Sequence, residues 1–178
     1  MTDPQNTPAG RGPRAGRHRS TRPRTLHLID LENLVAGNVT PDSCAGAWDE
    51  YRRELGVRWD DHVVVAVSEK NALTAFLVLP GTVQKVVGPN TADGADHALL
   101  DAVDPGWAHA RFRQVVIASG DHIFAPLARR LSGDGLLVVQ AIGGGWTSTE
   151  LYLECGKQYY LTELQRRFHT GLTLVPSI

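Results

Sequence analysis

The sequence predicts an α/β protein in which a mostly parallel β-sheet lies between two layers of helices. Short runs of residues are apolar throughout, and helix-length segments alternate with them along the chain. Strands that are buried on both faces have such continuous apolar runs, and strands connected through helices form parallel sheets. The 178 residues suffice for one domain of this kind with a tail.

Five strands are expected in chain order. Each run is apolar or β-branched and too short for a surface helix. The expected strands are Leu26–Ile29, His62–Val67, Val83–Val87, Val115–Ala118 and Leu136–Ile142. Because right-handed crossovers connect parallel strands, their carboxyl ends meet at one edge, where open α/β sheets bind ligands.

Helices are expected between these strands. Thr40 followed by Pro41 is typical of a helix start, and this first helix should run to about Leu55. The other expected helices are Asn71–Leu79, Ala92–Val103, Phe124–Leu131 and Thr149–Leu164, the last with a closing strand at Tyr159–Leu161.

The first 24 residues differ from the domain at 25–178. They are rich in Pro, Gly and Arg, with little to bury, so we expect a disordered arm. Residues 1–25 hold six arginines and one aspartate, a net charge of +5, which leaves 12 basic and 18 acidic residues in the remainder. The arm either contacts phosphate nonspecifically or is a solvated leader.

Nothing in the sequence indicates a membrane or secreted protein. No window approaches the roughly 18 consecutive apolar residues of a membrane span, and the N-terminus lacks the apolar stretch of a secretory signal. Cys44 and Cys155 match no metal or redox spacing. We therefore expect a cytoplasmic protein with two reduced thiols.

Three aspartates follow expected strands. Asp30 follows the first strand, Asp96 lies in the segment after the third, and Asp121 follows the fourth. If they converge, their repulsion is relieved by a divalent cation with oxygen ligands, Mg²⁺ or Mn²⁺. Aspartates at such places also cap helices or form turns, and for Asp93, which precedes Gly94, we favour a turn over ligation.

Three motifs carry a resemblance to a known family. They are Leu28–Leu34 (LIDLENL), Gly94–Asp101 (GADHALLD) and Val116–Leu127 (VIASGDHIFAPL). In this order and spacing they resemble the NYN family of PIN-like nucleases. The resemblance implies a three-layer α/β/α PIN-like fold with strand order 3-2-1-4-5 and a metal-dependent ribonuclease. It assigns Asp30, Asp96 and Asp121 to the acidic cluster and Asn33 to the support of the first aspartate.

The chain departs from the family pattern at two positions. Ile123 stands where the family usually has a second acid after Ser-Gly-Asp. Asp101 falls one residue earlier than the family's later helix acid, which on a helix turns it by about 100°. Glu32 or Asp101 could substitute for the missing carboxylate.

The expected reaction is endonucleolytic hydrolysis of RNA. Water activated by one or two Mg²⁺ or Mn²⁺ ions attacks phosphorus in line and leaves 3′-hydroxyl and 5′-phosphate ends. Ser119 is expected to orient ligands, and His122 is a conceivable general base or only a residue of the helix start. The candidates for RNA contact are Lys70, Arg22, Arg24 and Trp146.

For Lys70 a solvated side chain is the alternative, and for Trp146 a cover over the core. Gly143–Gly145 before Trp146 suggest a mobile loop. The other tryptophans, Trp48, Trp59 and Trp107, are expected to pack.

Other functions remain open or are disfavoured. With a reduced acid set, the chain is alternatively a catalytically impaired PIN-like module that binds RNA or a protein, and it is compatible with a homo-oligomer. Phosphoryl chemistry of the haloacid-dehalogenase or receiver type predicts Asp-x-Asp after the first strand or a lysine after the fifth, and neither occurs. A dinucleotide site needs a glycine-rich turn after the first strand, which Asp30–Asn33 lacks.

Overall fold

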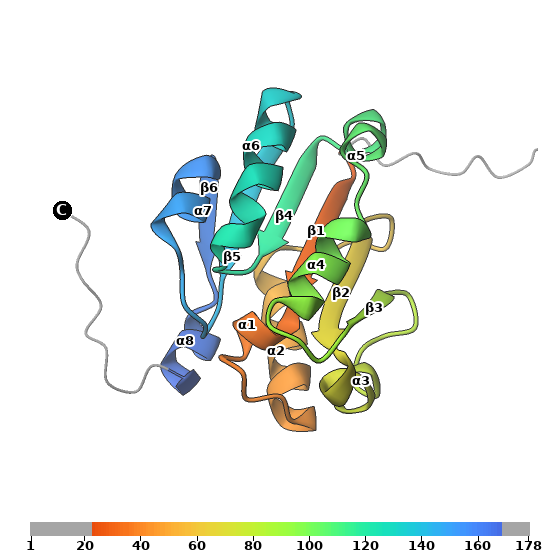
Figure 1. Cartoon of the computed structure of the whole chain (residues 1–178), viewed down its shortest axis with the longest axis vertical. Coiled ribbons are helices and arrows are strands. Elements are labelled where there is room, and N and C mark those ends of the chain that lie inside the picture. The colour runs from red at the N-terminus through yellow and green to blue at the C-terminus, as the bar shows by residue number, and fades with distance from the viewer. Residues whose placement is uncertain (1–22, 169–178) are drawn as a thin grey trace, which may run out of the picture.

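The computed structural model describes residues 23–168 of the chain. Its centre is a six-stranded sheet with the order β3-β2-β1-β4-β5-β6, in which every neighbouring pair is parallel (Figure 1). This confirms the predicted α/β class and the order of the first five strands, and β6 extends the sheet. Of the predicted arm, residues 1–22 lie outside the described residues, and Arg22 is among them. Only Pro23 and Arg24 of the arm are described.

The five predicted strands occur within two residues of the expected bounds. The strands are β1 (Thr25–Asp30), β2 (His62–Ser68), β3 (Gln84–Gly88), β4 (Gln114–Ala118), β5 (Leu137–Ile142) and β6 (Lys157–Tyr160). The α-helices are α1 (Leu31–Leu34), α2 (Pro41–Glu54), α3 (Glu69–Phe76), α4 (Gly94–Asp101), α5 (Pro105–Arg111), α6 (Ala125–Gly133), α7 (Thr149–Glu154) and α8 (Thr162–Phe168). A short 3₁₀ helix, η1 (His122–Phe124), precedes α6.

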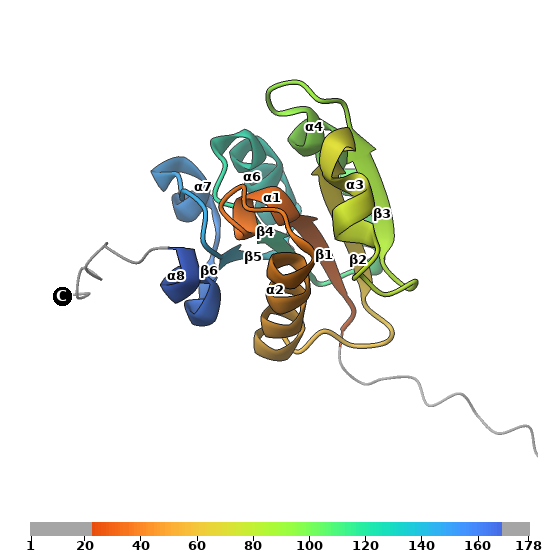
Figure 2. The same ribbon diagram turned by 90° about the horizontal axis from the view of Figure 1, so that it is seen from below.

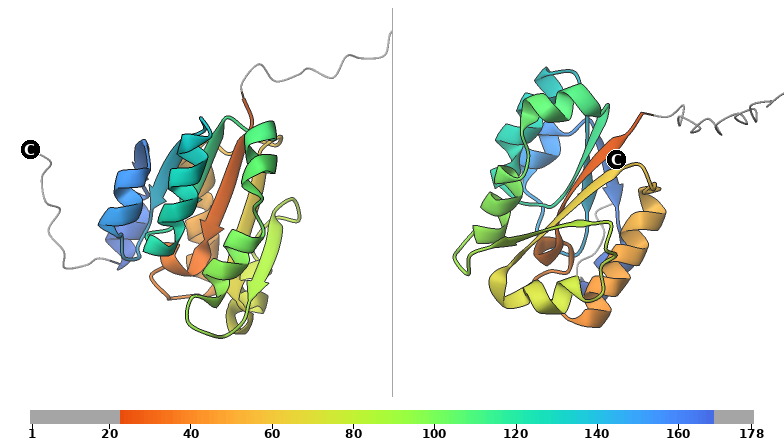
Figure 3. Two further views of the ribbon diagram at one scale, coloured as in Figure 1. Left: turned by 45° about the horizontal axis from the view of Figure 1, so that its top comes forward. Right: turned by 90° about the vertical axis from the view of Figure 1, so that its right-hand side faces the viewer.

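Helices cover both faces of the sheet (Figures 2 and 3). Along β2, Val63, Val65 and Val67 pack with α2, α3 and α8, whereas Val64 and Ala66 pack with α4 to α7. Successive side chains of a strand point to opposite faces, so a run that is apolar throughout fills two cores at once. This is why the strands lack an alternating pattern.

The predicted start of α2 is confirmed. The Thr40 side chain accepts a hydrogen bond from the backbone N–H of Ser43, and the Ser43 hydroxyl accepts one from the N–H of Thr40. Pro41 is the first helical residue, where its missing N–H costs nothing. No helix in residues 23–168 is long and apolar enough to cross a membrane.

The prediction of one helix over Thr149–Leu164 is wrong in its extent, whereas the closing strand expected at Tyr159–Leu161 occurs as β6 (Lys157–Tyr160). The chain leaves α7 at Cys155, pairs β6 with β5, and enters α8 after Leu161. The buried Glu50 of α2 accepts hydrogen bonds at 2.8 Å from the backbone N–H groups of Glu163 and Leu164, which satisfies the start of α8. These contacts are long-range, so a local helix pattern did not reveal them. The short helix α5 was not predicted either.

The tryptophans divide into packed and exposed residues. Trp48 and Trp107 pack against the two cores as expected. Trp59, in the turn between α2 and β2, is 88% exposed, so its predicted packing role is wrong. Residues of the same turn take part in a polar network.

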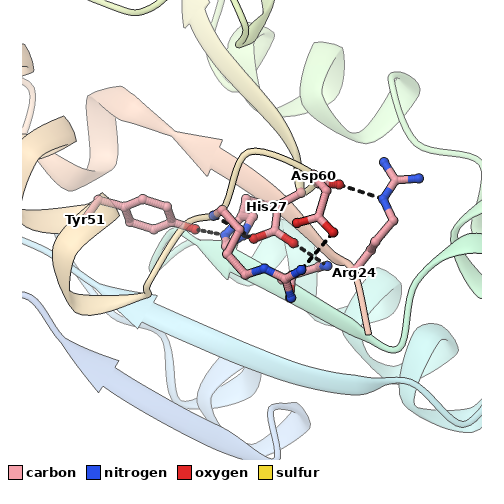
Figure 4. A network of polar contacts seen from close by, with 7 residues as sticks. Arg24, His27, Tyr51 and Asp60 are labelled. Atoms are coloured by element: carbon pink, nitrogen blue, oxygen red, sulfur yellow. Dashed lines mark hydrogen bonds and ion pairs between the residues drawn. The ribbon is translucent and has the colours of Figure 1, made fainter. Parts of the chain in front are cut away.

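That network joins the turn to the amino end of β1 (Figure 4). Nδ1 of the buried His27 lies 2.8 Å from the Tyr51 hydroxyl, and Nε2 faces Asp61 at 3.6 Å. Asp61 also accepts from the N–H groups of Thr25 and Arg58. Burial opposes ionisation of Asp61, but His27 and these N–H groups outweigh it and lower its pKa. Because His27 is 1% exposed, this Asp-His-Tyr arrangement braces the fold and is closed to substrate.

Candidate metal centre

A cleft of about 460 Å³ opens at the carboxyl end of the parallel strands. Asp30 is the last residue of β1, Asp121 follows β4, and Asp96 lies in the first turn of α4. All three line this cleft, together with Glu32, Asn33, Ser68, Lys70, Asp93 and the residues 90–95 around Asp93. Aspartates from distant segments therefore meet in one place, as the strand-end rule requires.

Four carboxylates form the centre of the cleft. One oxygen from each of Asp93, Asp96 and Asp121 lies within 4.8 Å of the others. Asp30 lines the same cleft beside Asp96, whose charge raises the pKa of Asp30. We call these four residues the acidic centre. The oxygens of Asp93, Asp96 and Asp121 are close enough for one divalent cation to relieve the repulsion between them.

Asp93 has the turn conformation that the sequence favoured, and its side chain also lies among the clustered carboxylates. Asp93 has a left-handed backbone (φ 55°) at the N-cap position of α4, as a turn residue would, and its side chain makes no capping hydrogen bond. Its carboxylate nevertheless belongs to the acidic centre. Placing residue 93 three positions before Asp96 brings both side chains to the same side of the chain, which was the signal that the sequence interpretation passed over.

Burial and mutual repulsion hold protons on this centre. Burial, followed by the charge of Asp96, raises the pKa of Asp30 to about 8, although bonds from Asn33 and Ser119 act in the opposite direction. Burial, followed by the charge of Asp121, also raises the pKa of Asp96. Within residues 23–168, no lysine or arginine forms an ion pair with any of the four aspartates. A cation would therefore gain from carboxylates that no lysine or arginine of the described residues neutralises.

A layer of hydrogen bonds fixes the aspartates. The Ser119 hydroxyl donates to Asp30 Oδ2 at 2.9 Å and accepts from the N–H of Asp121 at 3.1 Å, so one buried side chain links two acids. Asp30 Oδ1 accepts from the N–H of Asn33 and caps α1. Asn33 Oδ1 accepts from the N–H of Gly120 at 2.9 Å. The capping alternative and the ligand role are thus compatible, because each cap orients a carboxylate toward the cleft.

Behind this layer lies a residue that the sequence did not single out. The buried Gln140 of β5 donates to the carbonyl of Ser119 at 3.0 Å. A polar residue inside an otherwise apolar strand was the available signal, since such a residue must find a partner in the core.

Glu32 and Lys70 form the wall next to β2. Glu32 Oε1 accepts from the Ser68 N–H and hydroxyl and from Asn71 Nδ2. Burial opposes ionisation of Glu32, but these bonds and the nearby Lys70 lower its pKa overall. Glu32 is thus a carboxylate whose ionised form is stabilised by hydrogen bonds beside the acidic centre, and Lys70 contributes a positive charge to the same cleft.

The two departures from the family pattern have structural counterparts. Ile123 packs against the apolar cluster under α6, so the position of the missing acid faces the core. Asp101 is exposed at the last residue of α4 and does not line the cleft. Asp93 is therefore the residue that supplies an additional carboxylate in this chain.

The candidate RNA contacts are spread over the molecule. Lys70 lines the cleft. Arg24 precedes β1 and donates to the Asp60 carbonyl at 2.6 Å, so a full strand separates it from the acidic centre, about 20 Å at about 3.3 Å per residue. Arg24 therefore lies at the opposite edge of the sheet from the cleft, and its contact with RNA phosphate stays a prediction. Arg22 lies outside the described residues.

Trp146 and His122 border a second groove of about 210 Å³. Trp146 is 90% exposed, so the alternative that it covers the core is wrong. Gly143–Gly145 allow close packing, since a Cβ on Gly145 would lie 2.3 Å from the Asn33 carbonyl oxygen. His122 Nδ1 lies 2.9 Å from Asp121 Oδ1, which orients that carboxylate.

Comparison with known proteins supports the fold only. No family model matches the chain, and no curated protein matches it. The crystal structure of a protein of unknown function from Vibrio parahaemolyticus RIMD 2210633 is similar, with a TM-score of 0.56 and 16% sequence identity over 80% of this chain and 95% of that chain. At this identity, the likeness shows a shared α/β architecture.

Proposed function

We propose that the protein is a metal-dependent endoribonuclease of the NYN type that uses the acidic centre to hydrolyse RNA phosphodiester bonds. The observation that carries the proposal is the approach of three carboxylate oxygens within 4.8 Å, with Asp30 lining the same cleft and no lysine or arginine paired to the group in residues 23–168. Oxygen-only donors of this kind fit Mg²⁺ or Mn²⁺.

The chain's own residues have distinct roles in this proposal. A bound Mg²⁺ or Mn²⁺ supplies charge neutralisation at the phosphate and lowers the pKa of a water. Asp93, Asp96 and Asp121 would hold the cation, with Asp30 beside them as a further carboxylate. Ser119 and Asn33 keep Asp30 and the Gly120 turn in place, and Lys70 attracts phosphate at the rim.

Asp93 is proposed to compensate for Ile123. The family pattern places an acid at residue 123, and here that side chain packs against the core. The carboxylate of Asp93 reaches the same group of oxygens from the other side of the cleft. The number of carboxylates is thereby restored by a different segment.

The location proposed for this activity is the cytoplasm. Cys44 and Cys155 are both buried free thiols, and burial with the neighbouring Glu154 charge raises the pKa of Cys155 to about 12. Unreactive buried thiols suit a reducing compartment.

The test is cleavage of a labelled single-stranded RNA in Mn²⁺, in Mg²⁺ and in EDTA. Wild type should cleave only with metal, and Asp121→Asn should abolish cleavage. Asp101→Asn is the matched control, since it makes the same substitution on an exposed aspartate outside the cleft. Equal cleavage by wild type and Asp121→Asn would refute the proposal.

The second candidate is an RNA-binding or protein-interaction module without turnover. The core-facing Ile123 favours it, because one family carboxylate is lost. Isothermal titration separates the two: Mn²⁺ binding that Asp121→Asn removes supports the enzyme, whereas RNA binding without Mn²⁺ binding or cleavage supports the module.

A further inference from the structure

The loop after β5 presents a tryptophan to solvent from a fixed backbone. The N–H of Gly144 donates to the Leu34 carbonyl at 2.8 Å, and the N–H of Ser148 donates to the Gly120 carbonyl at 2.7 Å. Between them, the Trp146 carbonyl accepts from Asn33 Nδ2 at 3.4 Å. Trp146 itself remains 90% exposed. These hydrogen bonds hold the backbone of the loop in a position from which the Trp146 side chain points to solvent.

The groove beside this indole is continuous with the acidic centre. Both Asn33 and Asp121 line the 460 Å³ cleft on one side and the 210 Å³ groove on the other. The groove wall is completed by Trp146, His122, Gly120, Thr147 and Ser148. A chain that crosses the acidic centre therefore continues into this groove.

The chemistry of the groove suits a nucleobase. Two aromatic rings, indole and imidazole, are available, and the side chain of His122 is 75% exposed. Among residues 23–168, the only fixed charge that lines it is the Asp121 carboxylate, which repels a phosphate but not a neutral ring. Hydroxyl groups of Thr147 and Ser148 are present at its edge. A planar ring with apolar faces and a polar rim is the ligand that matches.

We propose that this groove binds a base of single-stranded RNA next to the phosphate held at the acidic centre, with Trp146 as the stacking platform. The inference rests on the proposed function, because it assumes that the polymer bound at the acidic centre is RNA. It adds a direction to the substrate path: Lys70 lies on the far rim of the cleft, and the stacked base lies on the side of Asp121 and Trp146. It also predicts a preference for unpaired over paired RNA, since a paired base cannot enter the groove.

The test measures binding of a fluorescein-labelled single-stranded oligoadenylate RNA by anisotropy, in Ca²⁺, with intact RNA verified by gel. A second probe lacks one base in the middle of the same strand. Trp146→Ala should raise Kd for the complete probe about 5- to 100-fold, the loss of one base stack, and Trp146→Phe should recover part of it. Trp59→Ala is the matched control, since Trp59 is as exposed (88%) but lies at the other edge of the sheet, and its Kd should equal that of wild type.

Cleavage in Mn²⁺ by the same proteins separates this inference from the nuclease proposal. If RNA binding depends on Trp146 but neither wild type nor any variant cleaves RNA, the base site is supported and the nuclease proposal is refuted. If wild type cleaves RNA and Trp146→Ala binds the complete probe as tightly as wild type does, the base site falls and the nuclease stands. A wild type that binds no single-stranded RNA overturns the base site and leaves Trp146 as a contact for a protein partner.

Discussion

Replacing Asp30 by asparagine should stabilise the metal-free protein. The buried Asp30 carboxyl keeps its proton up to a pKa of about 8, whereas the unfolded chain releases it near 3.8. Between these values the native state binds more protons than the unfolded state, so its stability falls as pH rises through this interval. Asparagine carries no charge to desolvate and keeps an oxygen for the N–H of Asn33.

The size of the gain follows from the two pKa values. From pH 3.8 to pH 7, at about 1.4 kcal/mol per unit, the cost of keeping Asp30 in its native site reaches about 4 kcal/mol. The neighbouring Asp96 shares the repulsion, so we expect a measured gain on the order of 2 to 4 kcal/mol at pH 7 and a smaller one near pH 4.

The assay is urea unfolding in EDTA at several pH values between 4 and 8.5, followed by the same series with Mn²⁺. Asp30→Asn should exceed wild type in EDTA by an amount that grows with pH, and Mn²⁺ should stabilise wild type more than the variant. Asp101→Asn, on the exposed end of α4, should show no comparable growth with pH. A variant that is no more stable than wild type in EDTA at any pH would refute the assignment of repulsion to this site.

Three further outcomes are expected. Asp93→Asn should weaken Mn²⁺ binding about tenfold or more by isothermal titration, because it removes one of three clustered carboxylates, and an unchanged affinity would exclude Asp93 as a ligand. Ser119→Ala should weaken Mn²⁺ binding about 10- to 100-fold in the same assay, because it removes the hydroxyl that links Asp30 and Asp121, and an unchanged affinity would make Ser119 a packing residue only. Gly120→Ala should lower the free energy of unfolding by about 1 to 3 kcal/mol in urea, since a Cβ there would lie 1.5 Å from the Trp146 carbonyl oxygen. The control is Gly133→Ala in α6, where a Cβ has open space and the change should be neutral or stabilising. Equal effects of the two substitutions would contradict the packing argument.

The class of the fold and the location of the cleft could be predicted from local sequence. Runs such as His62–Val67 are apolar on both faces, and this pattern is compatible only with a sheet covered on two sides. Once the strands are parallel, aspartates that follow them, such as Asp30 and Asp121, must lie at one edge. Helix starts with strong caps, such as Thr40-Pro41, were equally accessible because their signal lies within four residues.

Tertiary structure alone decided the features that depend on contacts between distant segments. The sequence suggested a closing strand near Tyr159–Leu161, but pairing with the edge of β5 decided that β6 divides the expected helix into α7 and α8. Asp93 joins the acidic centre because the turn before α4 folds over the end of β1, and Trp146 is exposed because Asn33 and Gly120 hold its backbone. Local pattern determines which segments become strands and helices, since it acts over a few residues. The distances between carboxylates, and therefore the pKa of Asp30, arise only when packing brings those segments together.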